Sequence, residues 1–370
     1  MYLRKKALII FSSDMSSLAA EGGIRNYVKQ FISSRTDLDI DLLTVGNGNI
    51  PEISNAKNVF FEKVISRPTC IFFYLKTIFK IFAGSMHLPN YDCIIFNRHE
   101  DVVLRPFLHG SKCILLIHGS VKYGFSFWPG PIAYINSLFE RLLVPLMDVI
   151  YVLLKNPAAG VAFYKKRYPR YAEKIKYAPV PISNAFILNP SRKDTWRESE
   201  CLKIIYFGRI VENPKNVLSI AKLGRSIKDL KAKINMTFAG DGPDAEKLKE
   251  KVKELDLSNE TTFLGNVSHE KLPYLIASHH LSIIMSSFEG ICMSAIESLA
   301  IGVPVAAFPV GDIPEYIVDN ANGILLQPQA TSIENAVKVL SFIKNYEYRE
   351  DFQRLIESYY CEKAFAALEI

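Results

Sequence analysis

Short apolar runs, each followed by a loop and then by a helical stretch, constrain the fold of this chain more than any other feature. The second half contains five such runs in succession: Lys203–Phe207, Asn235–Ala239, Thr261–Leu264, Leu281–Met285 and Val305–Phe308. Strands that alternate with helices form a parallel sheet with helices on its faces, and ligands bind at its carboxyl edge. The pattern predicts a doubly wound α/β domain whose glycine-bearing loops lie together at one edge.

The first half of the chain shows the same alternation. Its expected strands are short and apolar: Ala7–Ser12, Ile40–Thr44, Val59–Lys63, Asp92–Asn97 and Lys112–Ile117. After the first strand, Gly22-Gly23 opens a helix expected over Ile24–Ser33. A glycine pair at this place lets the backbone approach a ligand closely, although an ordinary flexible loop has the same composition.

A domain boundary is expected within Pro179–Glu200, where Pro, Asn, Ser and charged residues replace the apolar runs. A chain of 370 residues, 49% of them hydrophobic, is long for one domain and sufficient for two cores. We therefore expect domains at residues 1–183 and 184–345, followed by a helical C-terminal segment at residues 346–370.

The charge is distributed unevenly along the chain. Residues 1–185 carry a net charge of +10 and the remainder carries −4, which gives +6 for the whole chain. A basic first half indicates an anionic partner, either nucleic acid or an anionic membrane surface. Aromatic residues at base-stacking spacing are missing from the basic stretches, so we expect no nucleic-acid partner.

Two apolar stretches of the first half bear on the membrane. Cys70–Gly84 is dense in Phe, Ile and Leu, with Lys76 and Lys80 one helical turn apart. Such a helix fits a membrane interface, and it equally fits a domain core with two surface lysines. A second helix, expected at Ile132–Met147, follows the segment SFWPGP, which could also touch lipid.

Neither stretch is a candidate for crossing a membrane, because no apolar run reaches the roughly 18 residues that a spanning helix needs. The six cysteines are scattered without a CxxC motif, which indicates buried thiols in a reducing cytoplasm.

The turn Phe288–Gly290 and the helix expected over Cys292–Ala300 form the most informative loop. Two carboxylates, Glu289 in the turn and Glu297 on the helix, lie eight positions apart. The helix N-terminus between them offers free N–H groups and a partial positive charge, which suits a phosphate. Carboxylates on both sides of a phosphate site match a nucleotide sugar, although two solvated glutamates on an amphipathic helix would show the same spacing.

Cationic side chains and a histidine complete the candidate site. The strand that ends at Gly208 presents Arg209 and, six positions later, Lys215 around a helix start, an arrangement that can hold two phosphates. His118 follows the strand Lys112–Ile117 and stands at its ligand-binding end, although a lone histidine is often structural.

An ordered series of these segments resembles one known family. The second half contains GRI with Lys215 (208–215), AGDGP (239–243), FLGNVS (263–268), FEGICMSAIE (288–297), GVPV (302–305) and GDIPE (311–315). Together with Gly22-Gly23 and His118-Gly119, the series resembles the retaining glycosyltransferases of family 4, of the bacterial surface-polysaccharide type, with their E-x(7)-E signature. The resemblance covers nearly the whole chain. It implies the GT-B fold, in which two Rossmann-like doubly wound parallel-sheet domains face a central cleft and a C-terminal helix crosses back to the first domain.

The resemblance implies a role for each matching residue. Glu289, His118, Arg209 and Lys215 would be catalytic, with the two cations on the donor diphosphate, and Glu297 would bind the ribose. Further donor-binding residues are expected in the glycine pair, beside the base and in the turn before the helix: Gly22, Gly23, Gly265, Asn266, Gly290, Ile291, Cys292, Met293 and Ser294. Two departures stand out, since Lys215 lies one residue further from Arg209 than is common in the family, and Cys292 replaces a frequent second glycine.

The implied activity is transfer of a hexose from a UDP- or GDP-sugar by front-face displacement with retention, without a cofactor or a metal ion. We expect the chain to have no Asp-x-Asp pair, the motif with which the metal-dependent glycosyltransferases of the other major fold hold a cation. We expect a lipid-linked saccharide as acceptor, in the synthesis of capsule, O-antigen or exopolysaccharide. The enzyme would be cytoplasmic and peripheral on the inner face of the cytoplasmic membrane.

Two other functions fit the same fold. One is a sugar-nucleotide epimerase, which needs no acceptor, and the other is a non-catalytic sugar-nucleotide-binding subunit of a partner transferase.

Overall fold

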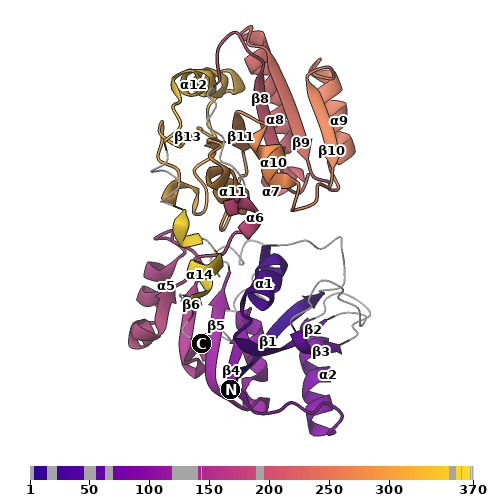
Figure 1. The fold of residues 1–370 in the computed structure, drawn as a ribbon, viewed down its shortest axis with the longest axis vertical. Coiled ribbons are helices and arrows are strands. Elements are labelled where there is room, and N and C mark those ends of the chain that lie inside the picture. Colours follow the sequence, from indigo (N-terminus) through magenta and orange to yellow (C-terminus); the bar gives the residue numbers. More distant parts are fainter. Residues whose placement is uncertain are drawn as a thin grey trace. The chain divides into compact units, whose positions relative to one another are not determined.

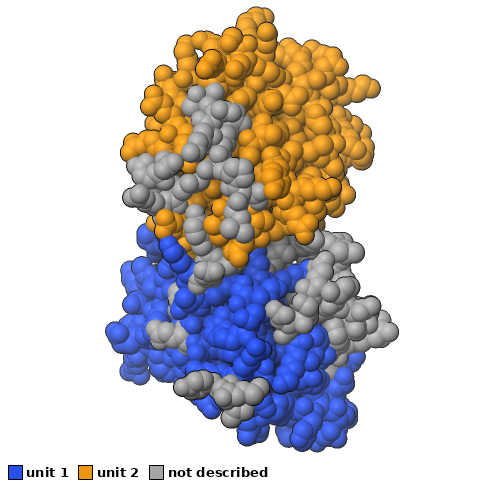
Figure 2. Space-filling view, viewed as in Figure 1, with its two compact units in different colours: residues 1–181, 361–370 blue, residues 182–360 orange. Residues whose placement is uncertain are grey.

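The computed structural model describes residues 4–14, 23–45, 56–62, 70–118, 141–142, 144–188, 196–349, 356–359, 361–366, 368 and 370. The chain divides into two compact units, one of residues 1–181 and 361–370 and the other of residues 182–360 (Figure 2). Each unit contains one parallel β-sheet, so the expected fold class of two α/β domains is confirmed.

The first unit is built on a seven-stranded parallel sheet in the order β3-β2-β1-β4-β5-β6-β7 (Figure 1). The strands are β1 Lys5–Asp14, β2 Leu38–Val45, β3 Ala56–Glu62, β4 Tyr91–Phe96, β5 Gly110–Ile117, β6 Val149–Val152 and β7 Ile175–Tyr177. Strands β2 and β3 lie on one side of β1, and strands β4 to β7 follow on its other side. The strand order therefore changes direction between β1 and β4, which is the switch point of a doubly wound sheet. Side chains 7–10 of β1 are at most 1% exposed, because helices cover both faces of a central parallel strand.

Helices and 3-10 segments alternate with these strands. They are α1 Gly23–Ser34, α2 Cys70–Phe82, η2 His99–Phe107, η3 Val144–Leu146, α5 Val161–Arg167, η4 Pro169–Lys174 and α14 Cys361–Ala366. Helix α14 packs on α1, where the ring of Phe365 meets the rings of Tyr27 and Phe31 at centroid distances of 5.7 and 5.2 Å. This contact attaches the C-terminal residues to the first unit.

Part of the predicted first domain lies outside the described residues. This applies to Gly22, to Gly119, to the SFWPGP segment and to most of the helix expected at Ile132–Met147. At the end of that helix, residues 141–142 are helical and η3 is a single 3-10 turn.

The second unit contains a six-stranded parallel sheet in the order β10-β9-β8-β11-β12-β13 (Figure 1). The strands are β8 Leu202–Phe207, β9 Ile234–Ala239, β10 Thr261–Gly265, β11 Leu281–Ile284, β12 Val305–Ala307 and β13 Gly323–Leu325. Alternate side chains enter two different cores, as Ile204 and Ile205 of β8 show.

Helices cover both faces of this sheet. The core of one face includes α8 Val217–Asp229, α9 Ala245–Glu254 and α12 Ser332–Asn345. The core of the other face includes α6 Asn184–Leu188, α10 Leu272–Ala277 and α11 Met293–Ile301. Gly302 has a φ of 84° and ends α11 in the left-handed conformation that glycine adopts at low cost.

Local backbone geometry sets two helix boundaries of this unit. The helical region after β8 is divided into α7 Glu212–Lys215 and α8, because Asn216 is left-handed with a φ of 51°. Helix α10 begins at Leu272, after a turn in which Ser268 O accepts hydrogen bonds from two backbone N–H groups.

Candidate functional site

The loops that follow β8, β9 and β10 are joined at the carboxyl edge of the second sheet. Gly208 N–H donates to Ala239 O at 2.9 Å, and Gly240 N–H donates to Gly265 O at 2.7 Å. Gly240 has a φ of 149°, and a Cβ at this position would collide with the carbonyl oxygen of Gly208. The backbones of these loops are therefore in direct contact, and this contact fixes the positions of the loop residues.

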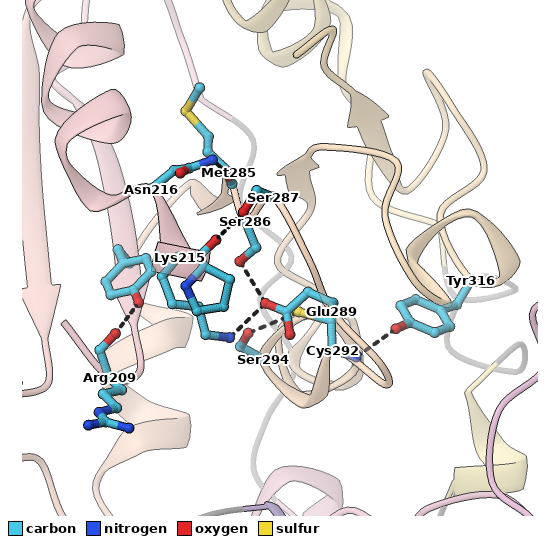
Figure 3. Close-up of polar contacts among 12 residues, drawn as sticks. Arg209, Lys215, Asn216, Met285, Ser286, Ser287, Glu289, Cys292, Ser294 and Tyr316 are labelled. Carbon is cyan, nitrogen blue, oxygen red and sulfur yellow. Dashed lines mark hydrogen bonds and ion pairs between the residues drawn. The ribbon is translucent and has the colours of Figure 1, made fainter. Parts of the chain in front are cut away.

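Glu289 stands in the turn after β11 and is held by two donors. Lys215 Nζ lies 2.6 Å from Glu289 Oε1, and Ser286 Oγ donates to the same oxygen at 2.6 Å (Figure 3). Ser286 is fully buried and Glu289 is 9% exposed. Among the described residues no donor contacts Oε2 of Glu289, so this oxygen is available to a hydroxyl group of a ligand.

The loops that carry this pair are attached to each other on both sides of Lys215. Asn216 Nδ2 donates to Met285 O at 2.9 Å, and Ser287 N–H donates to Pro214 O at 2.8 Å (Figure 3). The longer spacing between Arg209 and Lys215 is thus accommodated between β8 and α8, and the ammonium group still reaches the carboxylate.

The charges of this pair stabilise each other. Burial by itself would lower the pKa of Lys215, but the Glu289 carboxylate outweighs burial and raises this pKa above its usual value. Lys215 is therefore an ammonium ion at neutral pH. Burial also raises the pKa of Cys292 to about 12, so its thiol is neutral beside the pair.

The N-terminus of α11 has one free donor fewer than the sequence indicated. Cys292 N–H donates to the hydroxyl oxygen of Tyr316 at 3.0 Å (Figure 3). The next two N–H groups, of Met293 and Ser294, have no acceptor among the described residues. An anion at this helix end would therefore meet these two groups first.

Glu297 lies in the second turn of α11 and is partly buried. Burial raises its pKa to about 8, because the carboxylate form loses hydration. No hydrogen bond or ion pair to Glu297 is found in the part of the chain that the structure describes. A ligand that donates hydroxyl groups would favour the charged form.

Three further predicted residues of the second unit are exposed: Arg209, Gly265 and Asn266. The guanidinium of Arg209 points away from the pair of Lys215 and Glu289 (Figure 3), while its carbonyl oxygen accepts a hydrogen bond from the Tyr206 hydroxyl at 2.7 Å. Arg209 is therefore positioned by its backbone, and its side chain remains available to a ligand.

In the first unit, His118 follows β5, and its Nε2 lies 3.3 Å from Asn97 Oδ1. The ring of Tyr27 meets the imidazole edge-on at a centroid distance of 4.9 Å. Burial, with a smaller contribution from Arg98, lowers the pKa of His118 to about 3. The imidazole is therefore neutral at neutral pH. Of the predicted glycine pair, only Gly23 is described, and it begins α1.

Asp101 is a buried acid of the same unit that the sequence prediction missed. The Tyr74 hydroxyl donates to Asp101 Oδ1 at 2.9 Å, and Oδ2 is buried without a partner. Burial raises the pKa of Asp101 to about 7. In the sequence, the available signal was that Asp101 closely follows the expected strand Asp92–Asn97.

The expectation that the chain has no Asp-x-Asp pair is wrong, because Asp37, Asp39 and Asp41 form this pattern at the beginning of β2, outside the candidate site. Its carboxylates have protein partners, since Asp37 pairs with Arg35, Asp39 pairs with Lys57, and Asp41 accepts from Asn58 and Tyr91. Within the described ranges, no three His, Cys, Asp or Glu side chains lie together in a way that could hold a metal ion.

The structure thus brings Lys215 and Glu289 into contact directly ahead of the α11 N-terminus, while Gly23 and His118 belong to the other unit. The sequence prediction missed Ser286 and Tyr316. Ser286 donates to Glu289, and Tyr316 accepts from the N–H group of Cys292. Neither residue type stands out in its segment, so the sequence offered little signal for them.

Comparison with known proteins identifies relatives of this chain. A family model described as glycosyl transferases group 1 matches residues 190–357. An uncharacterized glycosyltransferase of Methanocaldococcus jannaschii is 30% identical over 294 residues, which cover 71% of this chain and 81% of that protein. A phosphatidylinositol N-acetylglucosaminyltransferase component of Homo sapiens is 25% identical over 185 residues, covering 48% of this chain and 37% of that protein.

Solved structures show the same architecture. The apo form of the lipopolysaccharide outer core galactosyltransferase WaaB has a TM-score of 0.71 at 15% sequence identity, over 98% of this chain and 97% of that chain. At this level of identity the similarity concerns the fold. It confirms the expected GT-B class with two Rossmann-like units.

Proposed function

The chain belongs to the glycosyl transferases group 1 family, and from this premise we propose a retaining family 4 hexosyltransferase that uses a nucleotide-diphosphate sugar. The observation that carries the proposal is the carboxylate of Glu289, held on one oxygen by Lys215 and Ser286 immediately before α11. A fixed carboxylate and the cation that contacts it lie directly ahead of a helix N-terminus, and they match the hydroxyls and the diphosphate of such a donor.

The cations would act on the leaving group. Arg209 and Lys215 would bind the diphosphate, and the N–H groups of Met293 and Ser294 would receive a phosphate oxygen. An ammonium group has three N–H donors, so Lys215 can contact a phosphate without leaving Glu289. Negative charge grows on the diphosphate as the glycosidic bond breaks, and these groups would stabilise that charge without reorganising.

The reaction would proceed on one face of the sugar. The acceptor oxygen would form its bond to the anomeric carbon on the side from which the diphosphate departs. The breaking bond leaves its electron pair on a phosphate oxygen, which would take the acceptor's proton. Glu289 Oε2 and the neutral imidazole of His118 would bind hydroxyls of the transferred sugar, and Glu297 would bind the ribose. Gly22, Gly23, Gly265 and Asn266 would border the donor.

The acceptor would be a lipid-linked saccharide of cell-surface polysaccharide synthesis. Two similar proteins carry names that refer to lipid-bearing molecules, phosphatidylinositol in one and lipopolysaccharide in the other. Among the helices that the structure describes, none has the length and apolarity needed to cross a membrane. The enzyme would work as a peripheral protein at the inner face of the cytoplasmic membrane.

Thermal stabilisation by a panel of UDP, GDP and their sugars tests the donor site. We expect one nucleotide family to raise the melting temperature of the wild type, and Glu297→Ala to weaken this shift. Glu250→Ala, which removes an exposed glutamate from α9, is the matched control and should keep the full shift. No shift with any nucleotide would contradict the proposal.

Turnover and stereochemistry test the reaction itself. With labelled donor and membrane extract, the wild type should form a lipid-soluble product and Glu289→Gln should not. NMR of the product should show the anomeric configuration of the donor. An inverted product would refute retention, nucleotide binding without turnover would identify a non-catalytic binding protein, and interconversion of the donor without acceptor would identify an epimerase.

A further inference from the structure

Helix α2 of the first unit has an unusual outward face. Its inward side chains Phe73, Tyr74 and Thr77 are buried against the unit. On the outward side, Leu75 is 57% exposed, Phe79 is 72% exposed and Phe82 is 75% exposed. These three residues, which we term the α2 face, are spaced by four and then three positions and therefore form one stripe along the helix.

An ordinary surface helix places charged and polar residues on this side. Here two large aromatic rings and a leucine face solvent instead. The sequence left open whether the helix is a core element or an interfacial one, and in the structure one of its sides is buried while the other is exposed. Single exposed apolar residues need no explanation, but a continuous stripe marks an interaction surface.

The charges beside the α2 face indicate what covers it. Lys76 and Lys80 follow Leu75 and Phe79 by one position each, so a cationic stripe runs alongside the apolar one. The helix contains no acidic residue. The outward side of α2 thus combines apolar and cationic groups, which suit a partner that is apolar and anionic along the same line.

The surface continues onto the end of η2. The ring of Phe107 meets that of Phe82 edge-on at a centroid distance of 5.6 Å. Two residues earlier, Arg105 donates a hydrogen bond to Leu108 O at 3.2 Å and lines a surface hollow together with His109. The apolar stripe of α2 thus continues from Phe82 to Phe107 at the end of η2.

We propose that the α2 face is a docking surface for a bilayer of anionic phospholipids. Leu75, Phe79 and Phe82 would enter the boundary between head groups and acyl chains, while Lys76 and Lys80 would reach the phosphates. The inference rests on the proposed function in one respect, namely that a lipid-linked acceptor gives the enzyme a reason to stand on a membrane.

Vesicle co-sedimentation of the full-length chain tests the proposal. At low salt the wild type should bind phosphatidylglycerol vesicles and leave phosphatidylcholine vesicles unbound. Leu75→Ser/Phe79→Ser should weaken binding at least about tenfold, because two apolar side chains no longer enter the bilayer. Lys76→Ala and Lys80→Ala should each weaken it roughly fivefold, an effect that added salt removes.

A matched control is available in the second unit. Ile333 and Val337 of α12 are 41% and 53% exposed and also lie four positions apart. Ile333→Ser/Val337→Ser should bind vesicles like the wild type. Because the replaced side chains are exposed, both double variants should melt at the wild-type temperature.

Three results would overturn the inference. They are equal binding to both kinds of vesicle, equal loss in the α2 and α12 variants, and a dimer in size-exclusion chromatography that the α2 substitutions dissociate. The last result would assign the α2 face to a second copy of the chain. The nucleotide-induced thermal shift of the α2 variant separates this inference from the proposed function, since vesicle docking and donor binding can fail independently.

Discussion

Replacing Lys215 with methionine should destabilise the second unit by about 3 kcal/mol at neutral pH. Methionine keeps an unbranched side chain while it removes the ammonium group that lies 2.6 Å from Glu289 Oε1. Removal of one partner from a buried pair costs roughly 3–5 kcal/mol, because the other charge is left without a counter-ion. The lower end applies here, since the side chains of Lys215 and Glu289 are 27% and 10% exposed and Ser286 still donates to the same oxygen.

Urea unfolding of the full-length chain can isolate this unit. The chain has two tryptophans, and Trp196 is buried in the core of the second unit. In a Trp128→Phe background, Trp196 fluorescence therefore reports the unfolding of that unit. The destabilisation should appear as a lower midpoint with an unchanged slope.

A double-mutant cycle tests whether the loss comes from the pair. Glu289→Gln removes the carboxylate charge, so Lys215→Met/Glu289→Gln should recover at least about 1.5 kcal/mol of the summed single losses. Ser286→Ala serves as the comparison, and it should cost about 1.5–3 kcal/mol only while Glu289 is charged. If the losses of Lys215→Met and Glu289→Gln add without coupling, the electrostatic account of the site is wrong.

Three further predictions follow from the described contacts. Burial raises the pKa of Asp101 to about 7, above its unfolded value of about 3.9, so the folded state binds the extra proton and wild-type stability should fall as pH rises through this window. Asp101→Asn should abolish this part of the pH dependence in urea titrations, and an unchanged slope would contradict it. The pKa of Glu297 is about 8 and its proton should be released when ribose hydroxyls bind, so calorimetry in buffers of different ionisation enthalpy should detect proton release at neutral pH in the wild type and none in Glu297→Gln. Gly311→Ala should cost at least about 1–2 kcal/mol for its left-handed φ of 59°, plus a collision with the carbonyl oxygens of residues 289 and 290. Gly265→Ala has a similar φ of 63° and open space around it, so an equal loss in both variants would refute the collision.

The sequence was sufficient to predict most strands of both sheets, because burial on both faces leaves a direct pattern in short apolar runs, while the three-residue strand β7 was missed. The expected strand Leu281–Met285 is observed as Leu281–Ile284, and the expected helix Cys292–Ala300 as Met293–Ile301. Glycine punctuation made these boundaries predictable, since Gly302 supplies the left-handed residue that ends the helix. The alternation of strands and helices was enough to predict that the glycine-bearing loops lie together at the carboxyl edge of the sheet.

The contacts between loops could not be predicted in the same way. Ser286 and Tyr316 act on Glu289 and on the α11 N-terminus through single hydrogen bonds, and no periodicity records such a bond. Asn216, where the helical region is broken, donates a hydrogen bond to Met285 O, which is 69 positions away in the chain. One N–H group that was expected to bind the donor, that of Cys292, therefore bonds to the Tyr316 hydroxyl instead.

Helix α2 shows the same division most clearly. By itself the sequence determined a helix that is apolar nearly all round, with Lys76 and Lys80 as its one polar stripe. Such a pattern has no preferred buried side, because every face gains from leaving water. Only packing against the first unit decided that Phe73 is buried and Phe79 exposed, and only the folded loops of the second unit brought Lys215 to Glu289.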